Sequence, residues 1–134
     1  IPVFGVIYKR GSVLVDRKSE ESRKNSFIQM KEVLALGLHM CIYPEGTRNK
    51  TTEPLQPFHN GAFRLAVDSG KAILPAVIFN TAKVLPANKK FFFWPVKIRM
   101  HFLEAVPVGS LSADQLKEKV FSIMKDHYVQ NRDQ

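Results

Sequence analysis

Two β-favourable runs flank a segment with helical periodicity, and this order constrains the fold more than any other feature of the sequence. The runs cover residues 13–15 and 39–43, and between them Phe27, Met30 and Leu34 recur at a helical spacing. A strand, a helix and a second strand in this order are typical of one crossover unit of an α/β fold.

The residues that flank this predicted helix define its limits. Ser19, Glu20 and Glu21 suit a helix start, because acidic side chains are favoured near the positive end of the helix dipole. Gly37 stands where a C-terminal cap is expected, since such caps often need glycine. The sequence therefore predicts a well-delimited helix between the two strands.

A second unit of strand, helix and strand follows. Residues 44–57 are rich in Pro, Gly, Thr and Asn and predict a loop at the end of the preceding strand. Residues 61–69 predict a helix, with Asn60 as a candidate N-cap and Gly70 after the end. Residues 73–79 predict an apolar strand.

The last part of the chain predicts one more strand and one more helix. Residues 97–102 alternate polar and apolar side chains, as a strand with one solvated face near a sheet edge does. Ser112 and Gln115 predict a capping box for a helix with one apolar stripe, formed by Leu116, Val120, Ile123, Met124 and Tyr128. The fold class predicted is α/β, with a mainly parallel or mixed sheet flanked by helices, in a single domain over residues 1–134.

Length and composition limit the classes of protein and partner. With 134 residues and 45% hydrophobic content, the chain can bury the core of one domain. The formal net charge of +8 favours an anionic partner, such as phosphate esters, nucleic acid or an acidic membrane surface. Cys41 is the only cysteine, so no internal disulfide is expected. The longest apolar stretch, residues 72–79, is shorter than the roughly 20 residues that cross a bilayer, so no membrane span is predicted.

The most informative segment covers residues 43–49, Tyr-Pro-Glu-Gly-Thr-Arg-Asn. It places a carboxylate, a glycine, a hydroxyl and a guanidinium after a predicted buried strand. Arg48 can offer a planar fork of donors to phosphate oxygens, and Glu45 could hold that fork or a neighbouring base in place. Gly46 lets the backbone approach a ligand closely. The alternative is a polar surface turn in which Glu45 and Arg48 pair with each other.

A second charged segment closes the first predicted strand. Residues 11–17 end in the adjacent opposite charges Asp16 and Arg17. Taken alone, a surface ion pair at a strand terminus explains these residues better than a ligand site, because exposed pairs are common and contribute little energy.

These segments resemble the acyltransferases that acylate glycerol-phosphate lipids, the 1-acyl-glycerol-3-phosphate acyltransferase family. One family block reads glycine, apolar strand, Asp or Asn, then Arg, and residues 11–17 are similar to it. Another reads aromatic-Pro-Glu-Gly-Thr-Arg, which residues 43–48 match at every position. Residues 58–62 and 73–77 resemble two further blocks, and all four stand in family order.

The resemblance implies a direct transfer of a fatty acyl group from a thioester, on coenzyme A or acyl carrier protein, to the free hydroxyl of a lysophospholipid. Arg17 and Arg48 are expected to clamp the phosphate of the acceptor, with Glu45, Gly46 and Thr47 in the same substrate-binding site. The resemblance implies no metal and no cofactor beyond the thioester co-substrate.

One departure from the family concerns catalysis. The family uses a histidine as general base and an aspartate five residues later to orient it. None of the four histidines has an aspartate at that distance: Pro44, Arg64, Val106 and Arg132 stand there. We therefore expect no catalytic residue in this chain, a dyad upstream of Ile1, and no activity of the chain alone. The alternative is a non-catalytic module that binds phospholipid or phosphate. Each histidine is expected to be a structural or surface group.

A basic and aromatic run, residues 89–94, suits either contact with a membrane surface or a buried strand. A membrane partner and a place at the cytoplasmic face of a membrane, peripheral or anchored, are expected. A nucleic-acid partner is not expected, because the sequence has neither a recognition helix nor zinc-ligand spacing.

Overall fold

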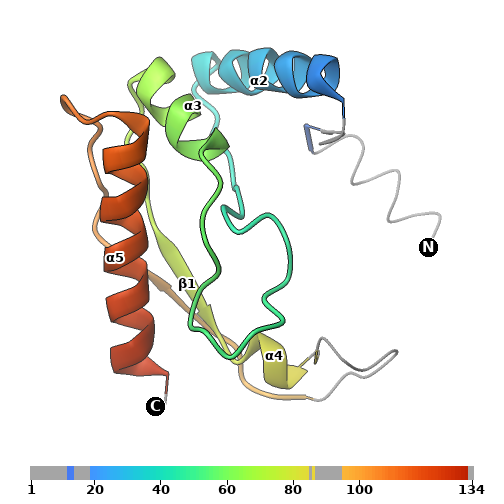
Figure 1. Ribbon diagram of the computed structural model, residues 1–134, viewed down its shortest axis with the longest axis vertical. Helices are drawn as coiled ribbons and strands as arrows, with labels where there is room; N and C mark the ends of the chain where they lie inside the picture. Colours follow the sequence, from blue (N-terminus) through green and yellow to red (C-terminus); the bar gives the residue numbers. More distant parts are fainter. Residues whose placement is uncertain (1–11, 14–18, 85, 87–94, 133–134) are drawn as a thin grey trace. The chain divides into compact units, whose positions relative to one another are not determined.

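The structure is a computed structural model that describes residues 12–13, 19–84, 86 and 95–132 (Figure 1). It divides into two compact units, Ile1–Cys41 and Ile42–Gln134. That these units form a single domain stays a prediction.

The first unit contains α2 (Glu20–Ala35), whose ends follow from local hydrogen bonds. The Ser19 side chain accepts a hydrogen bond from the Ser22 N–H at 3.1 Å and so caps the first turn. At the other end, Gly37 has φ +79° and donates to the Leu34 carbonyl, while Leu38 donates to the Val33 carbonyl. This pair of bonds is a Schellman motif, which only a residue tolerant of positive φ completes without strain. Both predicted helix ends are confirmed.

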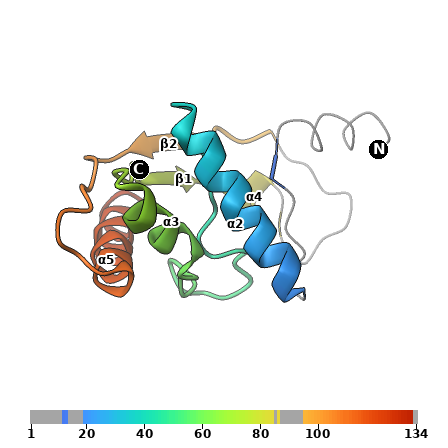
Figure 2. The same ribbon diagram turned by 90° about the horizontal axis from the view of Figure 1, so that it is seen from above.

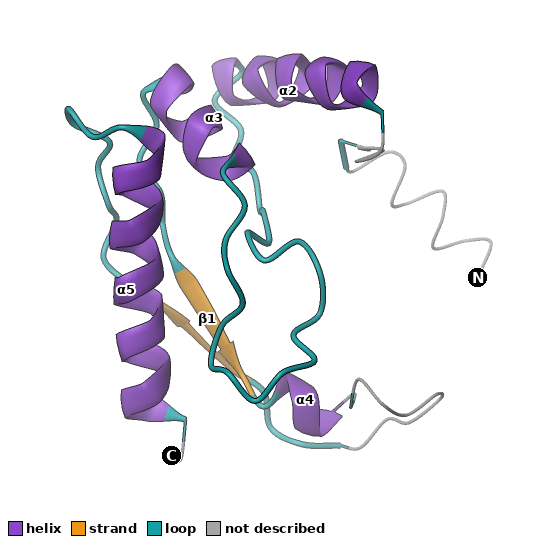
Figure 3. Cartoon of the chain, in the orientation of Figure 1, coloured by secondary structure: helices purple, strands orange, loops and turns teal. Residues whose placement is uncertain are grey.

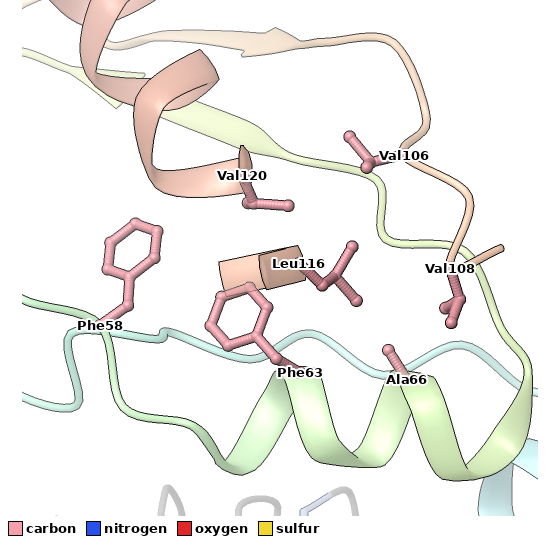
Figure 4. Packing of buried hydrophobic residues seen from close by; sticks show 7 residues of the cluster. All are labelled: Phe58, Phe63, Ala66, Val106, Val108, Leu116 and Val120. Carbon is pink, nitrogen blue, oxygen red and sulfur yellow. The ribbon is translucent and has the colours of Figure 1, made fainter. Parts of the chain in front are cut away.

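The second unit is built around two helices, α3 (Gly61–Ser69) and α5 (Ala113–Asn131), which pack against each other. A shared apolar cluster fills the contact, and Leu116 lies at its centre, fully buried (Figure 4). Its buried members are Phe58, Phe63, Ala66, Val106, Val108, Leu116 and Val120. Because these residues come from a loop, both helices and the chain before α5, the cluster ties together most of the unit.

Both helices are delimited as predicted, with one exception. The capping box of Ser112 and Gln115 begins α5, and Gly70, at φ +63°, ends α3. Asn60 precedes α3, but its side chain does not cap that helix. It reaches the first turn of α5 instead, donating to Asp114 Oδ1 at 2.8 Å and accepting from Lys117 Nζ at 2.8 Å. Two charged partners outside the helix therefore compete successfully for the amide.

The apolar run at residues 73–79 forms β1 (Ala76–Phe79), which pairs antiparallel with β2 (Arg99–Phe102), as Figure 2 shows. A four-residue helix, α4 (Thr81–Val84), lies in the connection. Parallel pairing needs a crossover of a dozen or more residues that returns the chain to the same end of the sheet. β2 instead begins at the end of the pair where β1 stops, since Phe79 pairs with Arg99, and the two strands are antiparallel. The predicted sheet was mainly parallel or mixed, and the strands of the described residues show this antiparallel pair alone.

The pairing continues past β1 with one irregularity. An isolated bridge joins Ile73 to Val106. Ile73 lies three residues before Ala76, whereas Val106 lies four residues after Phe102, the residue that pairs with Ala76. One extra residue on the second chain segment makes this a β-bulge. Pro75 lies next to the bulge, opposite Leu103, and accepts a hydrogen bond from the Leu103 N–H at 2.9 Å. A proline, which has no N–H to donate, is tolerated at such a site.

The alternation predicted for β2 is present, but the faces are reversed. Met100 and Phe102 are 46% and 63% exposed, whereas Arg99 and His101 are half-buried. The register explains this, because Arg99 and His101 pair with the buried Phe79 and Val77 on the face toward α5. The predicted assignment of the polar side chains to the solvated face was wrong.

Residues 39–43 were predicted to form a strand and do not; they lie in a loop, with Tyr43 71% exposed. A β-favourable run becomes a strand only when a neighbouring strand accepts and donates its backbone hydrogen bonds. In the described part of the chain, no such neighbour pairs with this run.

Candidate functional site

A long loop joins residue 38 to α3 without any helix or strand (Figure 3). Loops longer than about 12–15 residues are uncommon in compact proteins and are often functional. This loop carries the predicted site residues Glu45, Gly46, Thr47 and Arg48, and its central part, residues 44–57, was predicted as a loop.

The site begins with a tight turn at the start of the second unit. The Gly46 N–H donates to the Tyr43 carbonyl at 3.0 Å, and Gly46 has φ +68°, a value that favours glycine. The Pro44 carbonyl accepts from the His59 N–H at 2.9 Å, which ties the beginning of the loop to its end. These two hydrogen bonds hold the beginning of the loop in place.

Glu45 is half-buried, and its side chain anchors the loop. Its Oε2 accepts a hydrogen bond from the Gln56 N–H at 2.8 Å. No ion pair joins Glu45 to Arg48, although both residues are described. The surface pair that was the alternative for this segment is therefore absent, and Glu45 does not hold the guanidinium.

Thr47 and Arg48 project from the exposed part of the turn. No partner for the Arg48 guanidinium is found among the described residues. An exposed guanidinium whose N–H groups are open can donate two parallel hydrogen bonds to phosphate oxygens in one plane. The loop thus presents a hydroxyl and a cation at adjacent exposed positions, two and three residues after the anchored carboxylate of Glu45.

Asn49 follows Arg48 and has partners that were not predicted. Its Oδ1 accepts from Thr51 N–H at 2.9 Å and Thr51 Oγ1 at 2.7 Å, and its Nδ2 donates to the Glu53 carbonyl at 2.8 Å. An Asn with a Thr two positions later is a local signal for a side-chain-closed turn, so this part of the network could have been found from the sequence. The more remote partner, Gln56 Nε2 at 3.4 Å, gives no such signal.

Two parts of the predicted site lie outside the described residues. Arg17 is one, so its convergence with Arg48 on one phosphate stays a prediction. The basic and aromatic run at residues 89–94 is the other.

The histidines fall into two groups. His39 and His59 are exposed, whereas His101 and His127 are half-buried and share a hydrogen bond of 2.9 Å between Nδ1 and Nε2. Both half-buried rings also lie beside Phe79, with centroids 4.9 and 6.2 Å away. These two rings are half-buried, packed side chains; that no histidine of this chain is catalytic stays a prediction.

The described residues contain neither a metal-binding cluster nor a membrane-spanning helix. No group of three or more histidine, cysteine or acidic side chains is close enough together to hold a metal ion. No helix has both the length and the apolar character that crossing a bilayer requires.

Comparisons with known proteins identify the family. The model of the acyltransferase family matches residues 1–79, which include the whole of the Tyr-Pro-Glu-Gly-Thr-Arg segment. A crystal structure of a 1-acyl-sn-glycerophosphate (LPA) acyltransferase, PlsC, from Thermotoga maritima is similar, with a TM-score of 0.71 and 25% identity. The match covers 78% of this chain and 43% of that one.

Curated relatives carry related names. The human 1-acyl-sn-glycerol-3-phosphate acyltransferase beta is 33% identical over 84% of this chain and 40% of its own length. The Haemophilus influenzae 1-acyl-sn-glycerol-3-phosphate acyltransferase is 28% identical over 88% of this chain and 48% of its own length. The chain thus spans less than half the length of these relatives.

The likeness to PlsC confirms the predicted fold class, a partial α/β acyltransferase fold. The family match covers more than half of the chain and contains the described site loop. This chain belongs to the acyltransferase family.

Proposed function

We propose that this protein takes part in moving a fatty acyl group from an acyl thioester to the free hydroxyl of a lysophospholipid such as 1-acyl-glycerol-3-phosphate, in phospholipid biosynthesis. The observation that carries the proposal is the exposed Arg48 in an anchored loop within the segment that the family model matches. Similar proteins named 1-acyl-sn-glycerol-3-phosphate acyltransferases support the choice of acceptor.

In this proposal, Arg48 binds the phosphate of the acceptor through paired charge-assisted hydrogen bonds. The Thr47 hydroxyl offers a further donor, and Gly46 lets the backbone come close to the ligand. Glu45 contributes indirectly, since its carboxylate fixes the loop through Gln56 rather than touching the guanidinium. Arg17 supplies the second guanidinium, and the two together hold the acceptor so that its hydroxyl is presented for reaction.

We propose the remaining roles by analogy with the family. The acyl donor is a thioester of coenzyme A or acyl carrier protein, with no metal and no further cofactor. The protein works at the cytoplasmic face of a membrane, where the lysophospholipid is found. The net charge of +8 supports attraction to an acidic lipid surface.

Arg48→Ala tests the phosphate assignment. We expect the dissociation constant for glycerol 3-phosphate, measured by NMR titration, to rise by about 10- to 100-fold, because a hydrogen bond to a charged group contributes roughly 1.5–3 kcal/mol. Arg64→Ala is the matched control, because Arg64 is an exposed arginine on α3 and its substitution removes the same charge. Equal affinities of the two variants would show that only the net charge matters and would overturn the assignment.

A second candidate function is a non-catalytic module that binds phospholipid or phosphate. It is favoured by one observation, that none of the four histidines has an aspartate five positions later. Both candidates predict that the 134-residue chain binds glycerol 3-phosphate and does not consume acyl-coenzyme A. Turnover by this chain would refute the expectation that it lacks the catalytic base. Restored turnover on adding a family segment with the His-x-x-x-x-Asp motif would favour the enzyme over the module.

A further inference from the structure

The side chain with the most hydrogen bonds in the site loop belongs to Asn49, the residue next to Arg48. Its amide uses both of its ends: Oδ1 accepts from the Thr51 backbone and hydroxyl and from Gln56, while Nδ2 donates to the Glu53 carbonyl. Thr51 Oγ1 also accepts from the Glu53 N–H at 3.2 Å. The bonds fix the backbone on the C-terminal side of Arg48.

Gln56 connects this network to the other side of Arg48. Its backbone N–H donates to Glu45, and its side chain donates to Asn49. Arg48 therefore lies between two residues, Glu45 and Asn49, that are both bonded to the same distant residue. The chain from Glu45 to Asn49 is held at both ends.

Apolar packing cannot explain the order of this part of the loop. Residues 50–53 are exposed, and none of them belongs to the apolar cluster of the second unit. Fixing the backbone of an exposed segment costs conformational entropy, which hydrogen bonds must offset. The hydrogen bonds of Asn49, Thr51 and Gln56 are the interactions that can offset this entropy cost.

We propose that Asn49 and Thr51 are positioning residues for Arg48, which hold the loop in the conformation that binds a phosphate ester. The inference rests on the proposed function, because it assigns a supporting role within the same site. A loop that samples several conformations binds with an affinity reduced by the fraction that is competent. Holding the loop in one conformation before the ligand arrives removes part of that loss.

Thr51→Val tests the inference, because it removes the hydroxyl while keeping nearly the same volume. The variant loses two bonds, Thr51 Oγ1 to Asn49 Oδ1 and Glu53 N–H to Thr51 Oγ1. We expect the dissociation constant for glycerol 3-phosphate to rise about three- to tenfold, the factor for a net hydrogen bond of about 1 kcal/mol. The melting temperature should stay unchanged, since the loop is outside the apolar cluster.

Two variants serve as matched controls. Thr52→Val makes the same chemical change at an exposed neighbour that has no hydrogen bond to any described residue, and it should leave the affinity unchanged. Thr51→Ser keeps the hydroxyl and should restore most of the affinity lost in Thr51→Val. An equal loss in both valine variants would overturn the inference.

A double-mutant cycle separates this inference from the proposed function. In an Arg48→Ala background, Thr51→Val should have a much smaller effect, because the network acts mainly through Arg48 and only the weaker contribution of Thr47 remains. Additive losses would mean that the network acts elsewhere, which overturns the positioning role. If Arg48→Ala itself leaves the affinity unchanged, the proposed function fails; if Arg48→Ala weakens binding and Thr51→Val does not, only the positioning role fails.

Discussion

The apolar cluster between α3 and α5 and the site loop are ordered by different interactions. The cluster excludes water from side chains such as Leu116 and Phe63, which are 0% and 1% exposed. The loop leaves Thr47 and Arg48 in solvent and is held by hydrogen bonds that Glu45 accepts from Gln56 and that Asn49 donates to Glu53. If the loop binds the acceptor as proposed, stability and ligand binding depend on separate residues, and a substitution can change one property while leaving the other intact.

Leu116→Ala should have the largest effect on the cluster side of this comparison. Truncation of a fully buried leucine leaves a cavity and lowers the free energy of unfolding by about 2–5 kcal/mol. Leu74→Ala, at a leucine that is 57% exposed, should lower it by only about 0.5 kcal/mol or less. Chemical denaturation measures both; equal losses would mean that the cluster does not carry the stability of the unit.

Ser112→Ala should have an intermediate effect. The variant removes the side-chain oxygen that accepts from the Gln115 N–H at the start of α5, at a cost of about 1 kcal/mol. Ser110→Ala, two residues earlier, removes an exposed hydroxyl that has no hydrogen bond to a described residue and serves as its control. Thermal unfolding should distinguish the two, and affinity for glycerol 3-phosphate should be the same in both.

Substitutions of Glu45 should have the smallest effect on global stability and a local effect in the loop. Glu45→Ala leaves the Gln56 N–H without its acceptor, so hydrogen exchange at that amide should quicken by about fivefold, which corresponds to roughly 1 kcal/mol. Glu45→Gln keeps an acceptor oxygen and should preserve the protection. Faster exchange in the glutamine variant would show that the negative charge, rather than the hydrogen bond, holds the loop.

The helices could be predicted from the sequence because their signals are local. Caps at Ser19 and Ser112 and the glycines at positions 37 and 70 act within a few residues of where they stand. The strands were predicted less well, since a strand depends on a partner that can lie anywhere in the chain. Residues 39–43 have the composition of a strand without such a partner among the described residues, and the faces of β2 depend on its register with β1.

The site shows the same division between local and distant information. Glu45, Gly46, Thr47 and Arg48 were chosen through their resemblance to a family motif, and they do lie together on one loop. The resemblance did not reveal that Glu45 bonds to Gln56, because that contact spans 11 residues and uses a backbone N–H, which every residue except proline has.

The bridge from Asn60 to α5 bears on the order of events in folding. It joins residues 54 and 57 positions apart in the sequence, Asn60 with Asp114 and with Lys117. Contacts so distant along the chain close a large loop and form only after the entropy of that closure has been overcome. We therefore expect the Asn60 side chain, at the C-terminal end of the site loop, to reach its final position only once the last helix has docked.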